Sequence, residues 1–474
     1  MIDLSPKKRV AVTISFSFSI RYLVRTGMLE MMRSFAEPVI CIFWDQEDLI
    51  EELRSKGFEV YIIPESHRGK LYSNIRIKLD YWFRFYRLKS PTRKTEPRYI
   101  EKFQPRKKVI LNRVREYYNY FRLLVPGYAN SLLSKEKELL LTDTNYNEML
   151  EWIDQLNIHA VFAVTPFHAQ EDLFLRAAEA KGKYMITSIL SFDNVVKRGW
   201  LPVQYDCYMV WNKHNAGEIR RIYTEAVRRN NDNVHIVGAA QFDFYKSQGH
   251  ILPKKEWLKM VGLPEDLDTK IILFAGGPVS LFPQEYQFLQ HINQALEQGR
   301  ILGNPVVLFR CHPIDRVERW KKELPESKHI FYDVSWTGAK KLTLTNVTEQ
   351  DIVKLCSTLY HTDVHINTAS TMTVDGSAFH KPQIGPGYDE LYPNQRWPLK
   401  MMYQQEYYLP IMQTNGILHP MSRNELIDNI NDALQHPEKF ITRSNDILEA
   451  IITYTDGKCT ERVIEVLKRE IAKV

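Results

Sequence analysis

The sequence predicts an α/β protein made of two Rossmann-like domains that face a central cleft. Short apolar runs alternate with amphipathic stretches in both halves of the chain, which is typical of β-α-β units with parallel sheets. The 474 residues suffice for two or three domains with full cores. Hydrophobic residues make up 44% and charged residues 25% of the chain, so a disordered, collagen-like or disulfide-scaffold protein is excluded.

The first series of β-α units is expected to form an N-terminal domain over residues 1–245. Its expected strands are 8–16, 38–44, 58–63, 159–164, 183–189, 206–211 and 233–237. Its expected helices are 24–35, 46–56, 145–156, 170–181 and 215–229. Gly238 follows the last strand and ends this series.

The second series is expected to form a C-terminal domain over residues 246–440. Its expected strands are 270–275, 304–310 and 363–366, and its expected helices are 284–298, 349–357, 372–379 and 423–435. Ser422 and Glu425 form a capping box at the start of the last of these helices. Residues 441–474 are expected to be helical and to pack back on the N-terminal domain.

The cysteines and the apolar runs indicate the compartment. The five cysteines are scattered without a C-x-x-C pair, which favours free thiols in a reducing environment. The N-terminus leads directly into a strand-like run, so no signal peptide is expected. No apolar stretch approaches the roughly 20 residues that span a bilayer. We therefore expect a cytoplasmic protein whose membrane contact, at the inner face of the plasma membrane, is peripheral.

One segment of the N-terminal half is strongly basic, and we expect it to be an insertion at 68–125. The whole chain has a net charge of +6, but residues 68–122 contain 17 Lys and Arg against 4 Asp and Glu. Tyrosine, tryptophan and phenylalanine alternate with these basic residues, a composition that suits an anionic membrane surface. The candidate membrane or acceptor docking residues are Arg76, Lys78, Trp82, Arg84, Arg87, Arg106, Lys107 and Lys108.

Two other interpretations of this basic segment stay open. It could be a solvated helical insertion whose aromatic side chains face a core. It could also bind nucleic acid through phosphate contacts and base stacking. No nucleic-acid-binding module is recognisable in the chain, so we expect no nucleic-acid partner.

Three stretches of the second half could carry chemistry, and each follows an expected strand. Gly276 and Gly277 come after the strand 270–275, where glycines let backbone N–H groups approach a phosphate. Their spacing matches neither G-x-G-x-x-G nor a Walker A loop, so an ordinary tight turn explains them equally well.

The second stretch, at the end of the strand 304–310, contains Arg310, His312 and Pro313. A histidine at the end of a strand can donate a hydrogen bond to a phosphate or a leaving group, and Arg310 could supply charge. The alternative is a surface histidine in a proline turn.

The third stretch, residues 367–375, contains Ser370, Thr371 and Asp375. Hydroxyl groups at the start of a helix that leaves a buried strand form a good anion site. The alternative for the two hydroxyls is an ordinary helix cap. Asp375 would contact the ribose or the base of the nucleotide, or it would form an ordinary salt bridge. Because all three stretches follow strands of one half, we expect them to line one edge of one sheet.

The order of these motifs resembles the donor domain of GT-B glycosyltransferases, in particular bacterial sialyltransferases and CDP-alditol transferases. Residues 188–194, 210–212 and 237–243 are similar to surface-carbohydrate transferases of bacterial polysaccharide loci. The resemblance covers roughly 160–385 and implies a GT-B fold. The chain departs from it in having no His-Gly pair like that of alditol transferases and no clear acidic motif matching the sialyltransferase base.

The resemblance implies roles for these residues. His312 would hold the donor phosphate and assist the leaving group, while Ser370 and Thr371 would bind the same phosphates. Departure of a nucleotide builds negative charge, which preorganised donors stabilise. The chain has no Asp-x-Asp triplet, so we expect neither a metal nor another cofactor.

An acceptor hydroxyl needs a base, which the N-terminal domain should supply. Candidates on loops after expected strands are Asp45, His168, Glu171 and Asp193. We expect Asp193 first and His168 second, although Asp193 could cap a turn and His168 could cap a helix.

The expected function is transfer of a sugar from a nucleotide-sugar donor to a glycan or lipid-linked glycan during bacterial capsule, O-antigen or other surface polysaccharide synthesis. The alternatives are a CDP-glycerol or ribitol phosphotransferase, a UDP-sugar 2-epimerase and a non-catalytic glycan- or membrane-binding protein. The sequence leaves open the transferred sugar, the base of the donor nucleotide, the identity of the catalytic base and the acceptor. It also leaves open whether the configuration at the sugar is inverted or retained.

Overall fold

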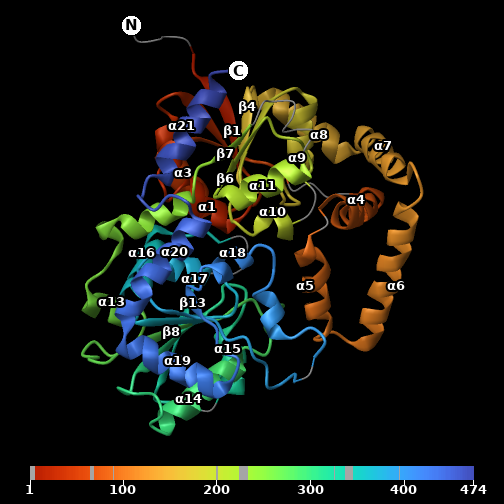
Figure 1. The fold of residues 1–474 in the computed structure, drawn as a ribbon. Helices are drawn as coiled ribbons and strands as arrows, with labels where there is room; N and C mark the ends of the chain where they lie inside the picture. Colours follow the sequence, from red (N-terminus) through yellow and green to blue (C-terminus); the bar gives the residue numbers. More distant parts are fainter. Residues whose placement is uncertain are drawn as a thin grey trace.

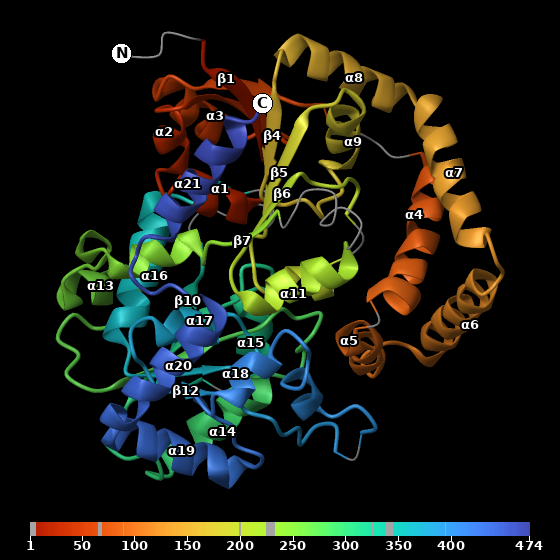
Figure 2. The same ribbon diagram turned by 45° about the horizontal axis from the view of Figure 1, so that its top comes forward.

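The computed structural model describes residues 6–64, 69–88, 90–198, 201–223, 233–324, 326–336, 345–393 and 395–474, with only the backbone at 87 and 88. Figure 1 shows two α/β domains stacked on one another, with a helical arm along one side. Figure 2 shows the same arrangement from above. Both sheets consist of parallel strands, which confirms the predicted α/β class with two Rossmann-like domains.

The N-terminal domain contains a seven-stranded sheet in the order β3-β2-β1-β4-β5-β6-β7. Its strands are β1 (Lys8–Ile14), β2 (Ala36–Ile42), β3 (Glu59–Ile62), β4 (Ala160–Ala163), β5 (Tyr184–Ser188), β6 (Cys207–Val210) and β7 (Val234–Ile236). Its helices are α1 (Ser17–Leu23), α2 (Met28–Met32), α3 (Glu47–Ser55), α8 (Thr144–Leu156), α9 (Asp172–Ala180), α10 (Asn194–Lys197) and α11 (Lys213–Ile222). The helix expected at 24–35 is shorter, because it begins only at α2 after Gly27, which adopts a left-handed conformation (φ 72°), while the helix α1 lies before residue 24.

The C-terminal domain contains a six-stranded sheet in the order β10-β9-β8-β11-β12-β13. Its strands are β8 (Ile271–Ala275), β9 (Val306–Cys311), β10 (Ile330–Val334), β11 (Val364–Asn367), β12 (Gln383–Ile384) and β13 (Ile417–Leu418). Its helices include α13 (Lys254–Met260), α14 (Tyr286–Glu297), α15 (Val317–Glu323), α16 (Glu349–His361), α17 (Met372–Ser377), α18 (Leu409–Gln413), α19 (Arg423–Gln435) and α20 (Ile441–Ile451). The sequence prediction missed β10, β12 and β13, of which the last two have only two residues each.

The last helix, α21 (Cys459–Ile471), crosses back to the N-terminal domain. Its apolar side chains Val463, Val466 and Leu467 join the core beneath β1 and β2. Tyr184 on β5 donates a hydrogen bond to Glu470 across 2.8 Å. The two domains are therefore joined by the segment η2 (Ala240–Lys246) and again by the chain between α20 and α21.

The basic segment lies within a helical arm between β3 and β4. The arm consists of α4 (Lys70–Trp82), η1 (Phe83–Leu88), α5 (Pro91–Glu101), α6 (Arg106–Leu123) and α7 (Tyr128–Leu141). In both views α5 extends to the C-terminal domain, while α6 forms the outer margin of the molecule (Figures 1 and 2). Within the described ranges, no helix is both long enough and apolar enough to cross a bilayer. All five cysteines are buried and unpaired.

Candidate functional site

The three motifs of the second half meet at one edge of the C-terminal sheet. The strands β9, β8 and β11 are direct neighbours and all run in the same direction. Each motif begins where one of them ends: Gly276 after β8, His312 after β9 and Thr368 after β11. The carboxyl edge of a parallel sheet is the usual ligand-binding edge of such folds.

A carboxyl group that the sequence prediction missed lies at the centre of this edge. Glu285, directly before α14, accepts a hydrogen bond from the backbone N–H of Gly277 across 2.7 Å. It is fully buried, and burial raises its pKa to about 7 despite the lowering influence of Thr368 and Gly277. Carboxyls whose pKa is shifted toward neutrality by burial are common at functional sites, so Glu285 is a candidate site residue beside the three motifs. Its eight-residue separation from Gly277 offered no sequence signal.

The backbone amides of the two glycines bond within the fold. The amide of Gly277 is occupied by Glu285, and the amide of Gly276 donates to the Arg310 carbonyl across 3.0 Å. A Cβ on Gly277 would lie 2.6 Å from Phe282, and one on Gly276 would lie 3.2 Å from Phe309 and Trp320. In this structure the glycines therefore permit close packing at the strand end, and a contact of their backbone with a phosphate stays a prediction.

His312 is half-buried at the end of β9. Its Nδ1 accepts a hydrogen bond from the Ile314 amide across 3.1 Å, which leaves the proton of the neutral ring on Nε2 as a donor. Burial lowers the pKa of His312 to about 4, although the neighbouring Asp315 acts in the opposite direction. Pro313 begins the turn in which the Asp315 amide bonds back to the His312 carbonyl across 2.8 Å. His312 is thus a neutral hydrogen-bond donor at neutral pH.

Arg310 does not supply charge to the edge, contrary to the prediction. Its guanidinium bonds to Asp333 and to the Ser335 carbonyl, at 3.2 and 3.1 Å. Lys354 of α16 contacts the same Asp333 carboxylate. All three charged side chains are buried, so Arg310 belongs to an ion cluster that joins β9, β10 and α16.

The hydroxyl motif forms a tight turn before α17. The Ser370 hydroxyl accepts a hydrogen bond from the Met372 amide across 3.2 Å, which is a local cap. Asn367 accepts hydrogen bonds from the Ser370 amide and the Thr373 hydroxyl, at 3.3 and 2.8 Å. Thr371 lies on the surface at the start of α17 and makes no side-chain cap. Both hydroxyls stay at the sheet edge, where their contact with a phosphate remains a prediction.

Asp375 holds the domains together, and the structure does not favour a ribose or base contact. Tyr245 of the η2 linker donates a hydrogen bond to Asp375 across 2.5 Å, and Arg21 of α1 lies 3.6 Å from it. The Arg21 guanidinium also bonds to the Tyr245 hydroxyl across 2.9 Å. Burial raises the pKa of Asp375, although Arg21 and Tyr245 oppose the shift. The N-terminal domain, the linker and the C-terminal domain each contribute one of these side chains.

The N-terminal domain holds a second buried carboxyl at its own strand ends. Glu171 accepts hydrogen bonds from the hydroxyls of Thr13, Ser15 and Thr165, at the ends of β1 and β4. Burial raises its pKa to about 7 against these three hydrogen bonds. Glu171 is fully enclosed, so in this structure it positions the neighbouring loops.

His168 follows β4, and its ring lies within a row of aromatic side chains. The centre of the His168 ring is 5.8 Å from the centre of the Phe16 ring. The centres of the Phe16 and Phe18 rings are in turn 5.2 Å apart. Phe18 in turn contacts Trp336 of the C-terminal domain at 5.2 Å. His168 therefore lies at the side of the N-terminal domain that faces the other domain, as a base of the acceptor would require.

Asp193 is placed less favourably for the predicted role of base. Its carboxylate lies 3.7 Å from the Lys197 ammonium, which also approaches Glu96 of α5 at 4.0 Å. Lys197 packs over the Tyr407 ring at 5.1 Å. Asp193 is thus part of an ion cluster beneath α5. Asp45 is exposed at the end of the loop after β2.

The helical arm contacts both domains. On α5, Tyr99 is fully buried in the core of the C-terminal domain and lies 6.2 Å from Phe282, the side chain that covers Gly277. Lys102 pairs with Asp389 at 3.3 Å, and Thr95 bonds to Gln405 across 2.9 Å. The arm therefore reaches the donor-side loop, although the sequence assigned it to the N-terminal domain alone.

The predicted docking residues fall into two groups. On α4, Arg76 pairs with Glu136 and Trp82 packs against a small core of the arm, and on η1 Arg84 pairs with Asp80, so these three point inward. Lys78 is half-exposed, and the Arg87 side chain lies outside the described residues. The group on α6 is exposed and comprises Arg106, Lys107 and Lys108.

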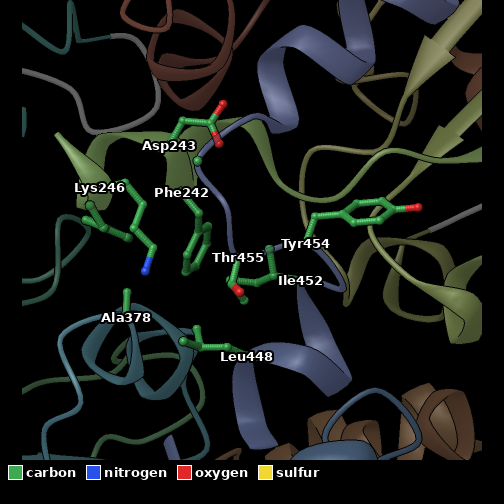
Figure 3. Close-up of a pocket in the computed structure, with 10 residues that line it drawn as sticks. Phe242, Asp243, Lys246, Ala378, Leu448, Ile452, Tyr454 and Thr455 are labelled. Carbon is green, nitrogen blue, oxygen red and sulfur yellow. The ribbon is translucent and has the colours of Figure 1, made fainter. Parts of the chain in front are cut away.

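Two cavities are lined by residues other than those of the three motifs. One of about 20 Å³ lies between the domains, where Phe242 and Leu448 line it and Tyr454 points away from it (Figure 3). It is large enough for a water molecule, not for a nucleotide. A larger one of about 530 Å³ is lined by residues of α11, α18 and α20, among them His214, Gln413 and Glu449.

Comparison with solved structures identifies the fold. A putative UDP-N-acetylglucosamine 2-epimerase from Listeria monocytogenes superimposes with a TM-score of 0.57 at 10% identity, covering 99% of this chain and 98% of that one. The UDP-GlcNAc 2-epimerase from Neisseria meningitidis bound to UDP-GlcNAc gives 0.55 at 9% identity, covering 97% and 100%. Arabidopsis thaliana UGT89C1 complexed with UDP-L-rhamnose gives 0.51 at 10% identity, covering 98% and 100%.

Sequence comparisons add nothing to this likeness. No protein-family model matches the chain, and no curated protein does. The structural matches span nearly the whole of both chains and include both domains. At these identities they concern the fold alone: the chain has the GT-B fold, with two Rossmann-like domains.

Proposed function

We propose that this chain is a nucleotide-sugar-dependent enzyme of the GT-B type that transfers a sugar to a glycan or lipid-linked glycan in bacterial surface polysaccharide synthesis. One observation carries the proposal. Three adjacent strands, β9, β8 and β11, present a neutral histidine, a buried carboxyl and a hydroxyl turn at one sheet edge. Structural neighbours of the same fold are described as bound to UDP-GlcNAc and UDP-L-rhamnose, which supports a nucleotide sugar as the ligand.

In the proposed reaction, the bond between the sugar carbon C1 and the donor phosphate breaks as an acceptor oxygen bonds to C1. The bonding electrons leave with the nucleotide, and a base on the N-terminal side takes the acceptor proton. The Nε2–H of His312 would donate to the phosphate oxygen that gains charge. His168 is the preferred candidate for the base, because Asp193 is paired beneath α5.

A UDP-sugar 2-epimerase is the second candidate, since two of the structural neighbours described above are UDP-GlcNAc 2-epimerases. An epimerase rearranges one small molecule and needs no acceptor surface. The arm from α4 to α7, with its exposed basic residues on α6, suits a macromolecular or lipid-linked acceptor. This arm favours the transferase.

The experiment begins with thermal shifts in CMP, CDP, UDP, GDP and dTDP, since a ligand that binds only the native state stabilises it. The matching nucleotide sugar is then incubated with the protein, with and without glycan or lipid-linked acceptors. A transferase releases nucleotide when acceptor is present. An epimerase converts the donor to its C2 epimer without an acceptor. The proposal is refuted if no nucleotide stabilises the protein and no nucleotide sugar is converted.

His312→Ala tests the site itself. Loss of one preorganised donor should reduce turnover by roughly 10²-fold. His436→Ala, which removes an exposed histidine of the same domain, is the matched control and should leave turnover unchanged. Equal activity of the two variants would remove His312 from the site.

A further inference from the structure

Helix α6 carries a continuous apolar stripe on its solvent-facing side. Along this helix, at its C-cap and at the residue after the cap, eight large apolar side chains are each more than half exposed. They are Ile110, Leu111, Val114, Tyr117, Tyr118, Phe121, Leu124 and Val125. Their spacing of three, four and seven residues places them on one face of a helix. Monomeric proteins rarely leave such a contiguous patch without a partner.

The arm itself does not cover this stripe. The buried residues of α6 are Asn119 and Leu123, which lie on another face, toward α4 and α7. By contrast, the apolar face of α21 is buried in the N-terminal core. Both views place α6 at the outer margin of the molecule (Figures 1 and 2).

Basic residues border the stripe. The helix contains six Lys and Arg and one acidic residue, Glu116, which is paired with Arg98 of α5 at 2.8 Å. Lys108, Arg115 and Arg122 are spaced by seven residues and thus form a row along one border. All three are exposed, as are Arg106 and Lys107 in the first turn. Among the described residues, none of these five side chains forms a salt bridge with a carboxylate.

We propose that α6 is a membrane-docking helix, which lies flat on a bilayer containing anionic lipid with its apolar stripe in the interface. An apolar face with bordering Lys and Arg is the pattern of helices that lie in the plane of a membrane. Anionic headgroups neutralise the basic row, whereas a second copy of α6 would bring two basic helices together. The charge therefore selects an anionic surface as the occupant.

This proposal sharpens the docking surface expected from the sequence. Arg76 of α4 and Arg84 of η1 are paired within the arm, so they contribute no free charge. The surface consists instead of α6, with its apolar stripe as the anchor. The helix lies outside the donor edge, and the proposal does not depend on the reaction that the enzyme catalyses.

Vesicle flotation of the full chain tests the proposal. We expect the protein to bind phosphatidylcholine vesicles containing 30% phosphatidylglycerol roughly tenfold better than pure phosphatidylcholine vesicles, with binding weakened by salt. The variant Leu111→Ser/Val114→Ser/Phe121→Ser should lose binding by roughly tenfold or more. The variant Lys108→Gln/Arg115→Gln/Arg122→Gln should lose the preference for phosphatidylglycerol. The matched control, Leu302→Ser/Leu391→Ser/Ile441→Ser, removes exposed apolar side chains elsewhere and should bind normally.

A labelling experiment locates the contact. Because all five native cysteines are buried, a cysteine introduced by Val114→Cys can be labelled selectively with an environment-sensitive dye. Its emission should shift to the blue with phosphatidylglycerol vesicles, while a dye at Leu302→Cys should not respond. Equal responses at the two sites, or no binding by the wild-type chain, would overturn the proposal.

Self-association is the competing outcome. If light scattering shows a dimer that the triple serine variant dissociates, a second copy covers the stripe and the proposal is wrong. The nucleotide-induced thermal shift, which tests the proposed function, should be the same in the α6 variants and the wild type. The two proposals can therefore fail independently.

Discussion

The side-chain amide of Gln284 donates a hydrogen bond to the Tyr99 hydroxyl across 3.0 Å, joining residues 185 positions apart in the sequence. Tyr99 belongs to α5 of the helical arm, and Gln284 directly precedes the buried Glu285. The arm thus supports the loop that carries the buried carboxyl at the candidate site of the C-terminal sheet. An insertion that begins in the N-terminal domain stabilises a site of the C-terminal domain.

Tyr99→Ala should destabilise the C-terminal domain, because it leaves a cavity where a large buried ring packed. A loss of about 3–5 kcal/mol is expected from large-to-small substitutions of this kind. Tyr99→Phe keeps the ring and should cost about 1 kcal/mol for the lost hydrogen bond. Urea unfolding measures both, and hydrogen exchange should speed up in residues 276–285 in Tyr99→Ala. Tyr117→Ala, at an exposed tyrosine, is the control. Equal effects at both sites would contradict the conclusion that Tyr99 supports the loop before Glu285.

Substitutions in the ion cluster of β9 and β10 distinguish a structural Arg310 from one that holds donor phosphate. Asp333→Asn leaves the cations of Arg310 and Lys354 buried without their carboxylate, and should cost about 3–5 kcal/mol. Arg310→Met should also lower the melting temperature, while the nucleotide-induced shift persists. Arg316→Met, at an exposed arginine nearby, should change neither quantity. A normal melting temperature with loss of the nucleotide shift in Arg310→Met would restore the donor role.

Glu285→Gln should alter the pH dependence of stability. The wild-type carboxyl has a folded pKa of about 7, above its unfolded value of 4.5. The unfolded state therefore releases its proton first, and this carboxyl's contribution to stability is lost as pH rises from about 4.5 to 7. Glutamine does not titrate, so the variant should gain stability relative to wild type across this window. Thermal unfolding between pH 4.5 and 8 measures the difference, and a constant difference would contradict the raised pKa. The exposed Glu318→Gln is the control.

The His312 ring should stay neutral at pH values well below the ordinary pKa of histidine. Its folded pKa is about 4, against 6.5 when unfolded, so the unfolded state binds a proton more readily. The contribution of His312 to stability is complete above pH 6.5 and is lost as pH falls toward 4. Histidine ring signals followed by NMR should include one that titrates near pH 4 and is missing in His312→Asn. A His312 signal that titrates near 6.5 would show that the ring is not buried as described.

The sequence by itself determined the strand-helix alternation, and with it the α/β class and the two parallel sheets. It also located the ends of β8, β9 and β11 at the same edge, because residues that follow parallel strands must gather there. The two-residue strands β12 and β13 escaped prediction because so short a run carries no periodicity.

Only the tertiary structure decided which polar side chains at that edge are already paired with other side chains and which could still contact a ligand. Arg310 lies at the end of β9 and Asp375 follows β11, but buried partners from β10, α1 and the linker occupy them. Glu285 came to the centre of the edge through a loop whose course no local pattern describes. The composition of α6 predicted an exposed basic surface, and only the structure showed that an exposed apolar stripe runs beside the basic residues. Pairing and burial depend on contacts between distant segments, and local sequence patterns do not contain them.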